Sequence, residues 1–92
     1  MEIGDGVTEL LHNDRSAFTI IDIVSDEEIV IQRDNATETY EEYYYEPDPK
    51  GKTFTITKRR DSRWRVKGVL DRKKYSTFLI GVRDEHHHDE EI

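Results

Sequence analysis

The sequence predicts a small, mainly β protein, folded as an antiparallel sheet or a partly open barrel of about five strands. The apolar residues are concentrated in short runs that are rich in β-branched side chains. Several segments also alternate apolar and polar residues with the two-residue period of a half-buried strand. Helical signals are few. Together these observations favour an all-β architecture with a small core.

The first third of the chain predicts three strands. Residues 4–11 begin with turn residues and continue into a short apolar stretch. Residues 18–24 are dense in β-branched side chains and too short for a typical helix, so they predict a largely buried strand. A polar turn at 25–28 leads into residues 29–33, which complete the first hairpin.

Residues 34–52 predict a long acidic loop that contains tyrosines and two prolines. Connections longer than about 12 residues in a compact domain are usually functional or mobile. The tyrosines at 43–45 also have the propensity to add a short strand. This segment is therefore a candidate binding region.

Side-chain alternation predicts the register of a second hairpin. A three-residue loop at 60–62 places four apolar residues on one face, namely Phe54, Ile56, Trp64 and Val66. A two-residue loop at 61–62 would instead oppose Ile56 to Lys67. The three-residue loop is therefore predicted, and Trp64 belongs to the core rather than to an exposed platform for stacking bases.

A last strand is predicted over residues 75–83, with Phe78, Ile80 and Val82 facing inward. An acidic tail at 84–92 follows it. The sequence has no internal repeat, so residues 1–92 are expected to form a single domain.

Composition limits the setting in which the protein acts. The chain has no cysteine, which excludes a disulfide framework and a thiolate metal site. The N-terminus has no signal-peptide pattern, and no apolar stretch approaches the roughly 20 residues that cross a bilayer. A cytoplasmic protein without a membrane partner is expected.

Charged residues are sorted into three blocks along the chain. Residues 1–49 hold 14 acidic and 2 basic residues, residues 50–83 hold 12 basic and 2 acidic, and residues 84–92 hold 5 acidic and none basic. Their net charges of -12, +10 and -5 give the total of -7. Either the fold interleaves the blocks or the surface is bipolar, and both outcomes favour a binding protein. The net negative charge counts against a broad surface for duplex DNA.

The predicted register gathers basic side chains on the outer face of the second hairpin. Arg59 lies opposite Arg63, and like charges opposed across a ladder are unfavourable without acids or a bound anion nearby. One interpretation is a site for phosphate or a nucleotide, because guanidinium groups and threonine hydroxyls suit phosphate oxygens. The other is that acids from the first half cover this face. The candidate anion-binding residues are Thr57, Arg59, Arg63, Arg65 and Lys67.

The acidic segment has two interpretations as well. It is either a solvated loop that keeps a small protein soluble, or a docking surface for a basic partner that handles nucleic acid. In a docking surface, tyrosines supply contact area and carboxylates steer the partner. The candidate partner-binding residues are Glu38, Glu41, Glu42, Tyr43, Tyr44 and Glu46.

Neither a metal site nor a catalytic site is predicted. The triplet His86 to His88 lies among acids, but adjacent residues on an extended chain point to alternate faces, so at most two of them share an ion easily. The sequence carries no nucleophile motif, P-loop or dinucleotide-binding glycine pattern. A non-enzymatic protein without a cofactor is therefore expected.

A resemblance is carried by four stretches of the chain, at residues 4–10, 14–20, 32–36 and 78–83. They are similar to a group of small uncharacterised proteins encoded by bacteriophages and prophages. In such sequences the second hairpin tends to have Asn-Gly at its turn, where this chain has Asp61-Ser62. The opening Gly-Asp-x-Val pattern is also similar to KOW-type small barrels, which bind RNA or protein. The phage resemblance implies inhibition of a host defence effector through its nucleic-acid site.

Three function hypotheses follow. The first is a phage-encoded, non-enzymatic inhibitor of a bacterial antiviral effector, of the anti-CRISPR or anti-restriction type, which docks by charge complementarity in the host cytoplasm. The second is a sponge that sequesters an anionic signalling nucleotide on the basic hairpin, as a homo-oligomer with its pocket between chains. The third is an RNA-binding small barrel. The sequence leaves open whether the basic face is exposed or covered.

Overall fold

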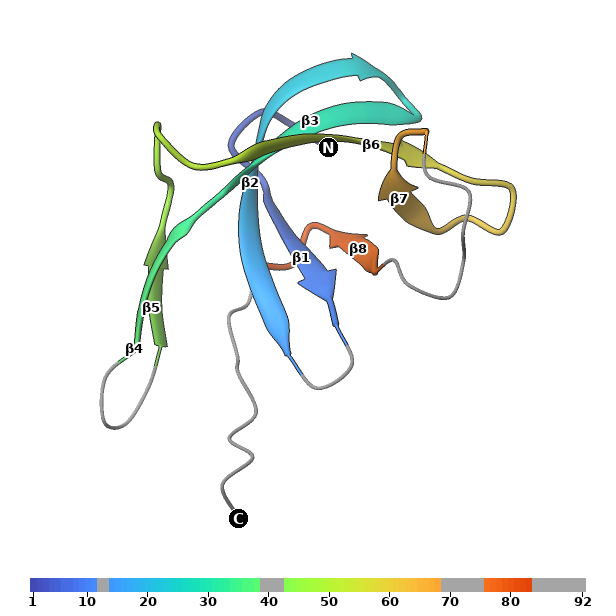
Figure 1. The fold of residues 1–92 in the computed structure, drawn as a ribbon. Coiled ribbons are helices and arrows are strands. Elements are labelled where there is room, and N and C mark those ends of the chain that lie inside the picture. Colours follow the sequence, from blue (N-terminus) through green and yellow to red (C-terminus); the bar gives the residue numbers. More distant parts are fainter. Residues whose placement is uncertain (12–13, 39–42, 69–75, 84–92) are drawn as a thin grey trace.

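A computed structural model describes residues 1–11, 14–38, 43–68 and 76–83. Among these residues the chain forms eight strands and no helix (Figure 1). The strands are β1 (Gly6–Leu10), β2 (Arg15–Ser25), β3 (Glu28–Arg33), β4 (Asn35–Glu38), β5 (Tyr43–Glu46), β6 (Thr53–Lys58), β7 (Trp64–Val66) and β8 (Thr77–Ile80). All of their pairings are antiparallel, so the predicted mainly β class is confirmed.

Six of the described strands close into a barrel in the order β1-β2-β3-β6-β7-β8. The ring closes because β8 pairs back on β1, from Val7 opposite Ile80 to Leu10 opposite Thr77. The joint between β7 and β8 is short and consists of Trp64 opposite Phe78. The barrel is therefore closed, where the sequence indicated a partly open one of about five strands.

Strand β2 curves around the barrel. Its register with β3 shifts at two places, between Ile20 and Asp22 and between Ile23 and Ser25. Each shift is a bulge, which inserts an extra residue, bends the strand and increases its twist. Because the extra residues leave the inward alternation, Ile21 and Val24 are exposed. The bulges thus supply the curvature that a small closed barrel requires.

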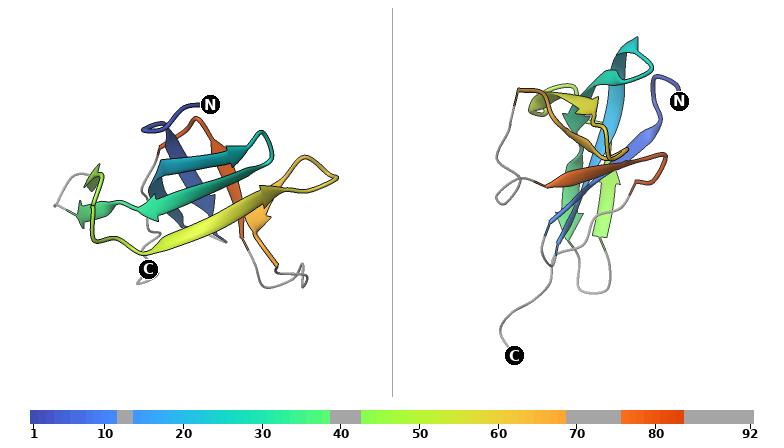
Figure 2. Two further views of the ribbon diagram at one scale, coloured as in Figure 1. Left: turned by 90° about the horizontal axis from the view of Figure 1, so that it is seen from above. Right: turned by 90° about the vertical axis from the view of Figure 1, so that its right-hand side faces the viewer.

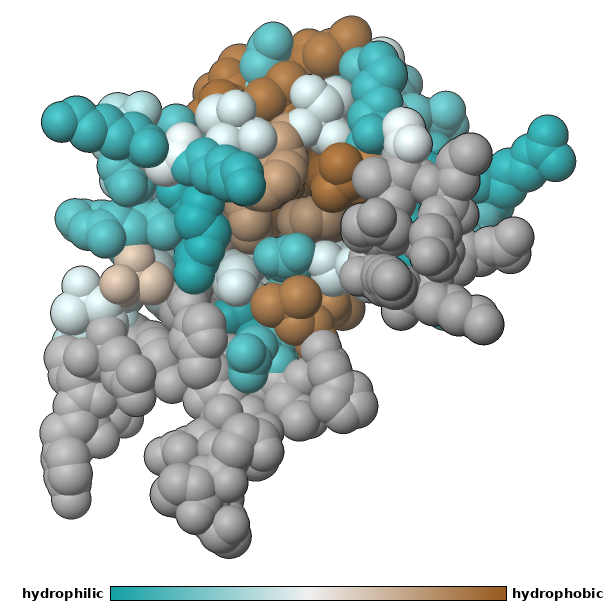
Figure 3. Space-filling view, viewed as in Figure 1, coloured by the Kyte–Doolittle hydropathy of each residue, from teal (hydrophilic) through white to brown (hydrophobic). Residues whose placement is uncertain are grey.

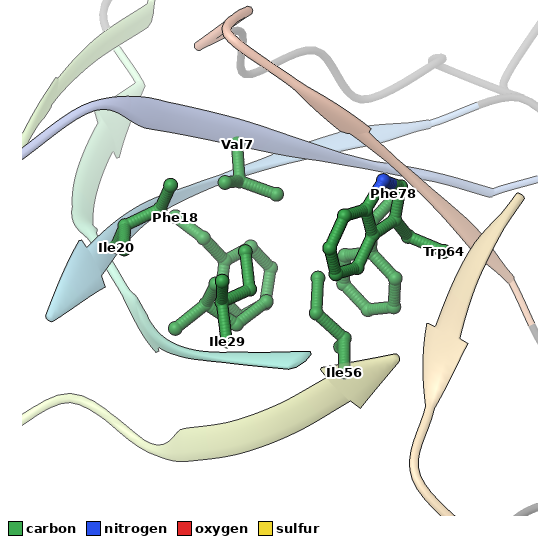
Figure 4. Packing of buried hydrophobic residues seen from close by; sticks show 8 residues of the cluster. Val7, Phe18, Ile20, Ile29, Ile56, Trp64 and Phe78 are labelled. Atoms are coloured by element: carbon green, nitrogen blue, oxygen red, sulfur yellow. The ribbon is translucent and has the colours of Figure 1, made fainter. Parts of the chain in front are cut away.

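The core fills the barrel with the inward residues of every barrel strand (Figure 4). Phe18 is 2% exposed and contacts Phe54 and Phe78 edge-on, at centroid distances of 5.9 and 5.8 Å. Trp64 packs in the same cluster, as its predicted place in the core requires. The other buried members are Val7, Ile20, Ile29, Ile31 and Ile56.

The last strand is shorter than the sequence predicted. It ends at Ile80 because Gly81 adopts a φ of 91°, which turns the chain out of the ladder. Phe78 is buried and Ile80 packs against the core, as predicted. The inward placement predicted for Val82 is wrong, since this residue lies beyond the turn and is exposed.

Strands β4 and β5 form a separate two-stranded sheet within the segment that the sequence predicted as a long loop. We call these two strands the arm. The arm leaves the barrel between β3 and β6, which are themselves neighbours (Figure 1). At its root the Arg33 amide donates to the Lys52 carbonyl, and the Gln32 side chain donates to the carbonyls of Pro49 and Gly51. Gly51 approaches the Arg33 carbonyl so closely that a Cβ would lie 2.1 Å from its oxygen.

Candidate functional site

The arm has one exposed face and one face turned towards the barrel. Its register pairs Asn35 with Glu46 and Thr37 with Tyr44, and all four of these residues are exposed. Tyr44 is the largest of them and is 55% exposed. On the other face, Ala36 and its partner Tyr45 are half-buried. An amphipathic two-stranded sheet of this kind presents the exposed face to solvent or to a partner.

The structure places two of the six predicted partner-binding residues together. Tyr44 and Glu46 are two positions apart on β5, so they share the exposed face of the arm. The backbones of Glu38 and Tyr43 pair with each other at the far end of the arm. Glu41 and Glu42 lie outside the described residues, as does the predicted acidic tail. Tyr44 and Glu46 therefore carry the candidate site.

A hollow at the arm is lined by residues from both of its faces. The hollow has a volume of about 290 Å³ and is lined by Asn35, Thr37, Tyr44, Tyr45 and Glu46. In the space-filling view, the visible part of the arm is mostly hydrophilic to neutral, whereas brown surface lies mainly along the upper edge of the barrel, with smaller brown patches below (Figure 3). The hollow is thus a polar feature of the arm and is separate from the exposed apolar surface of the barrel.

A buried ion pair holds the root of the arm. Asp34 precedes β4, its side chain is 0% exposed, and its Oδ2 lies 3.2 Å from Nε of Arg83. The Thr19 hydroxyl donates to Asp34 Oδ1 at 2.6 Å and accepts from Arg83 at 2.9 Å. Arg83 also donates to the Gly4 carbonyl, and its own carbonyl accepts from the Tyr45 hydroxyl at 2.8 Å. This network ties both termini of the barrel to the arm.

The register of the basic hairpin is the one that the sequence predicts. Thr57 pairs with Arg65, and the Arg59 amide donates to the Arg63 carbonyl, which closes a three-residue loop at 60–62. The Ser62 amide donates back to the Arg59 carbonyl, and Ser62 has a φ of 69°. This is a three-residue hairpin loop with its last residue in the left-handed region, a position that favours glycine.

Three of the five predicted anion-binding residues, Thr57, Arg59 and Lys67, make side-chain contacts within the protein. Arg59 turns back along the hairpin and donates to Thr57 Oγ1 and to the Val66 carbonyl, at 3.2 and 2.7 Å. Lys67 pairs with Glu28 on β3 at 2.9 Å. Arg63, which is 64% exposed at its side chain, has Asp61 at 4.0 Å. Arg59 and Lys67 thus have close internal partners, whereas the Asp61 carboxylate lies 4.0 Å from Arg63.

The arm does not cover the basic hairpin. Figure 1 and the left view of Figure 2, which are perpendicular to each other, show the arm and the β6–β7 hairpin on opposite sides of the barrel. The acid that meets the basic face is Glu28, which lies in the strand next to β6. The fold therefore places an acidic turn, which contains Glu27 and Glu28, beside the basic hairpin.

Replacing Ser62 with glycine is expected to stabilise the protein by about 0.5 to 1 kcal/mol, because the left-handed conformation strains a residue with a Cβ more than it strains glycine. The free energy of unfolding is measured by urea titration with the fluorescence of Trp64, the single tryptophan of the chain. Asp61→Gly is the matched control and should destabilise, since the Asp61 carboxylate accepts a hydrogen bond from the Arg63 amide at 3.0 Å. Equal destabilisation by both substitutions would contradict a strained position at 62.

The described residues contain no cluster of three or more histidine, cysteine or acidic side chains that could hold a metal ion. The triplet His86 to His88 lies outside the part of the chain that the structure describes. Within that part, no helix is long and apolar enough to cross a membrane.

Comparison with known proteins gives no relative. The chain matches no family model, no curated protein and no solved structure. The resemblances to phage proteins and to KOW-type barrels therefore stay predictions, and the function must be argued from the geometry of the arm and the basic hairpin.

Sequence reasoning missed Asn35 and Thr37 as part of the candidate site. Their two-residue spacing was available, but the segment 35–38 carries no apolar alternation that would indicate a strand. Only the pairing with β5 brings them beside Glu46 and Tyr44. The signal that could have found them is the strand propensity of the tyrosines at 43–45, because a short strand there needs a partner strand nearby.

Proposed function

We propose that this protein is a non-enzymatic binding protein that docks on a basic, nucleic-acid-handling partner with the exposed face of its arm. The observation that carries the proposal is the arm itself. It stands off the barrel as a separate sheet, its only charged residues are acidic, and its exposed face carries Tyr44 beside Glu46. An aromatic anchor next to a carboxylate suits a partner surface that is rich in arginine and lysine.

The side-chain contacts of the basic hairpin also favour the arm as the binding surface. A phosphate site needs cationic side chains that are available to a ligand. Arg59 and Lys67 already have close internal partners, and the hairpin face includes the Glu28 carboxylate. The geometry thus favours docking by the arm over sequestration of a nucleotide on the basic hairpin.

The resemblance to phage proteins suggests that the partner is an antiviral protein of the bacterial host. Antiviral effectors such as RNA-guided nucleases and restriction enzymes bind nucleic acid through positively charged surfaces. An acidic arm that occupies such a surface would compete with DNA. We therefore propose a bacterial antiviral nuclease as the partner, inhibited by exclusion of its substrate.

A cleavage assay with a panel of purified RNA-guided nucleases and restriction enzymes tests the proposal. At least one enzyme should be inhibited at a molar ratio near one, and excess DNA added first should protect it. The double variant Tyr44→Ala/Glu46→Lys should weaken inhibition about tenfold or more, because it removes the anchor and reverses a charge.

Asp26→Lys is the control for charge. It makes the same kind of charge reversal at an exposed position in the β2–β3 turn, away from the arm, and should leave inhibition within about twofold. Circular dichroism confirms that each variant is folded. Full inhibition by the arm variant, or no inhibition of any enzyme in the panel, would refute the proposal.

A further inference from the structure

Cationic side chains gather at the loop end of the β6–β7 hairpin. Residues 58–63 hold four cations and one acid. Lys58, Arg60 and Arg63 are exposed, and the Arg63 side chain is 64% exposed. We call these three residues the basic tip. They lie where the hairpin projects beyond the barrel, on the side opposite the arm (Figure 1 and Figure 2).

Hydrogen bonds of the backbone fix the shape of this loop. The Arg59 amide donates to the Arg63 carbonyl at 2.8 Å, and the Ser62 amide donates to the Arg59 carbonyl at 2.9 Å. The Asp61 carboxylate accepts from the Arg63 amide at 3.0 Å and lies 4.0 Å from Arg63 Nε, so the charge pair itself is weak and exposed to water. The Arg59 side chain turns back to the Val66 carbonyl and is not counted in the basic tip. The loop thus presents the three other cations on a hydrogen-bonded turn.

The shape and charge of the basic tip select the class of ligand. Guanidinium and ammonium groups pair well with phosphate oxygens. A projecting turn does not enclose a single nucleotide, but a chain of phosphates can reach several of its cations at once. Each phosphate that is neutralised releases counterions, so a polymer gains more from such a surface than a mononucleotide does. The basic tip is therefore suited to the backbone of a nucleic acid.

Acids beside the basic tip favour a single strand over a duplex. The Lys58 amide donates to the Glu27 carbonyl, and Glu28 pairs with Thr57, so the acidic turn of the β2–β3 hairpin lies next to β6. A duplex carries one negative charge per about 1.7 Å of its axis, about twice the density of one strand, and brings more of that charge near the two acids. The net charge of -7 adds to the repulsion.

We infer that the basic tip, formed by Lys58, Arg60 and Arg63, binds the phosphate backbone of a single-stranded nucleic acid. Base sequence should matter little, because residues 58–63 include no aromatic side chain and Trp64 packs in the core. The basic tip and the arm lie on opposite sides of the barrel, so the inference does not depend on the proposed docking function.

Fluorescence anisotropy with a labelled oligouridine of about 20 nucleotides tests the inference. Three phosphate contacts on a single strand predict that the affinity falls about 15- to 20-fold between about 50 and 200 mM salt. Arg60→Ala/Arg63→Ala should weaken binding about tenfold or more at the lower salt concentration and reduce the fall to about threefold. ATP and a duplex of the same length should both bind more weakly than oligouridine.

Lys50→Ala/Lys52→Ala is the matched control, because it removes two exposed cations at the root of the arm and should change the affinity by no more than about threefold. An unchanged salt dependence in the Arg60→Ala/Arg63→Ala variant, tighter binding of ATP or of the duplex, or no binding of oligouridine at the lower salt concentration would overturn the inference. Circular dichroism confirms that each variant is folded.

The arm variant Tyr44→Ala/Glu46→Lys separates this inference from the proposed function. It should bind oligouridine at least as tightly as the unchanged protein, although it should lose inhibition in the cleavage assay. Loss of oligouridine binding in this variant would overturn the basic tip as the site. Oligouridine binding without inhibition of any nuclease would support the basic tip and refute the proposed function.

Discussion

Replacing Phe18 with alanine is expected to destabilise the protein by about 3 to 5 kcal/mol, as is typical when a buried aromatic side chain is truncated. Phe18 lies on β2 at the centre of the core, with two edge-on aromatic neighbours and the Arg33 guanidinium 5.7 Å from its ring centroid. A domain of this size has a total stability of about 5 to 14 kcal/mol, so the loss removes between about a fifth and nearly all of it. Urea titration monitored by Trp64 fluorescence measures the change.

Two further substitutions show whether the loss comes from the core. Phe18→Leu keeps an apolar side chain but removes both aromatic contacts, so it should cost about 1 to 2 kcal/mol. Leu79→Ala lies on the outward side of β8 and should change stability by less than about 1 kcal/mol. A loss below about 1 kcal/mol for Phe18→Ala would contradict a core centred on this ring.

Replacing Arg83 with methionine is expected to destabilise the protein by about 3 to 5 kcal/mol, because it removes the cation that pairs with the buried Asp34 carboxylate. The Asp34 side chain would retain the Thr19 hydroxyl as a donor, which satisfies one of its two oxygens. Arg83 is 27% exposed at its side chain, so part of the cost is relieved by water. The free energy of unfolding is again the quantity measured.

The double variant Asp34→Leu/Arg83→Met separates loss of the pair from loss of packing. It removes both charges and should recover at least about 1 kcal/mol relative to Arg83→Met alone, since no buried charge is left unpaired. Arg63→Met, at an exposed arginine with a distant acid, should cost no more than about 1 kcal/mol. If Arg83→Met proved as mild as Arg63→Met, the pair with Asp34 would not hold the root of the arm.

The parts of the fold that depend on neighbouring residues could be predicted from the sequence. The register of β6 and β7 followed from the alternation around Ile56 and Trp64 together with the length of the loop between them. The end of β8 could not be placed, because nothing in the sequence shows that Gly81 adopts a positive φ and removes Val82 from the core.

Contacts between residues far apart in the chain could not be predicted from the sequence. Closure of the barrel depends on pairing between β1 and β8, and many registers of two short apolar strands have similar patterns. The pair of Asp34 and Arg83 is formed by residues from different charge blocks with no local signal. For the candidate site, the sequence indicated the acids and tyrosines of β5, but the exposed face was fixed only by pairing with β4.

The arm joins the barrel at a place where insertions in the arm need not disturb the pairing of the barrel strands. Because β3 and β6 pair with each other as well as flanking the arm, the barrel register is set without the strands of the arm. Adding or removing one residue pair at the tip of the arm would lengthen or shorten its reach and keep every remaining side chain on its present face. The length of the arm can therefore change while the register of the barrel strands stays the same.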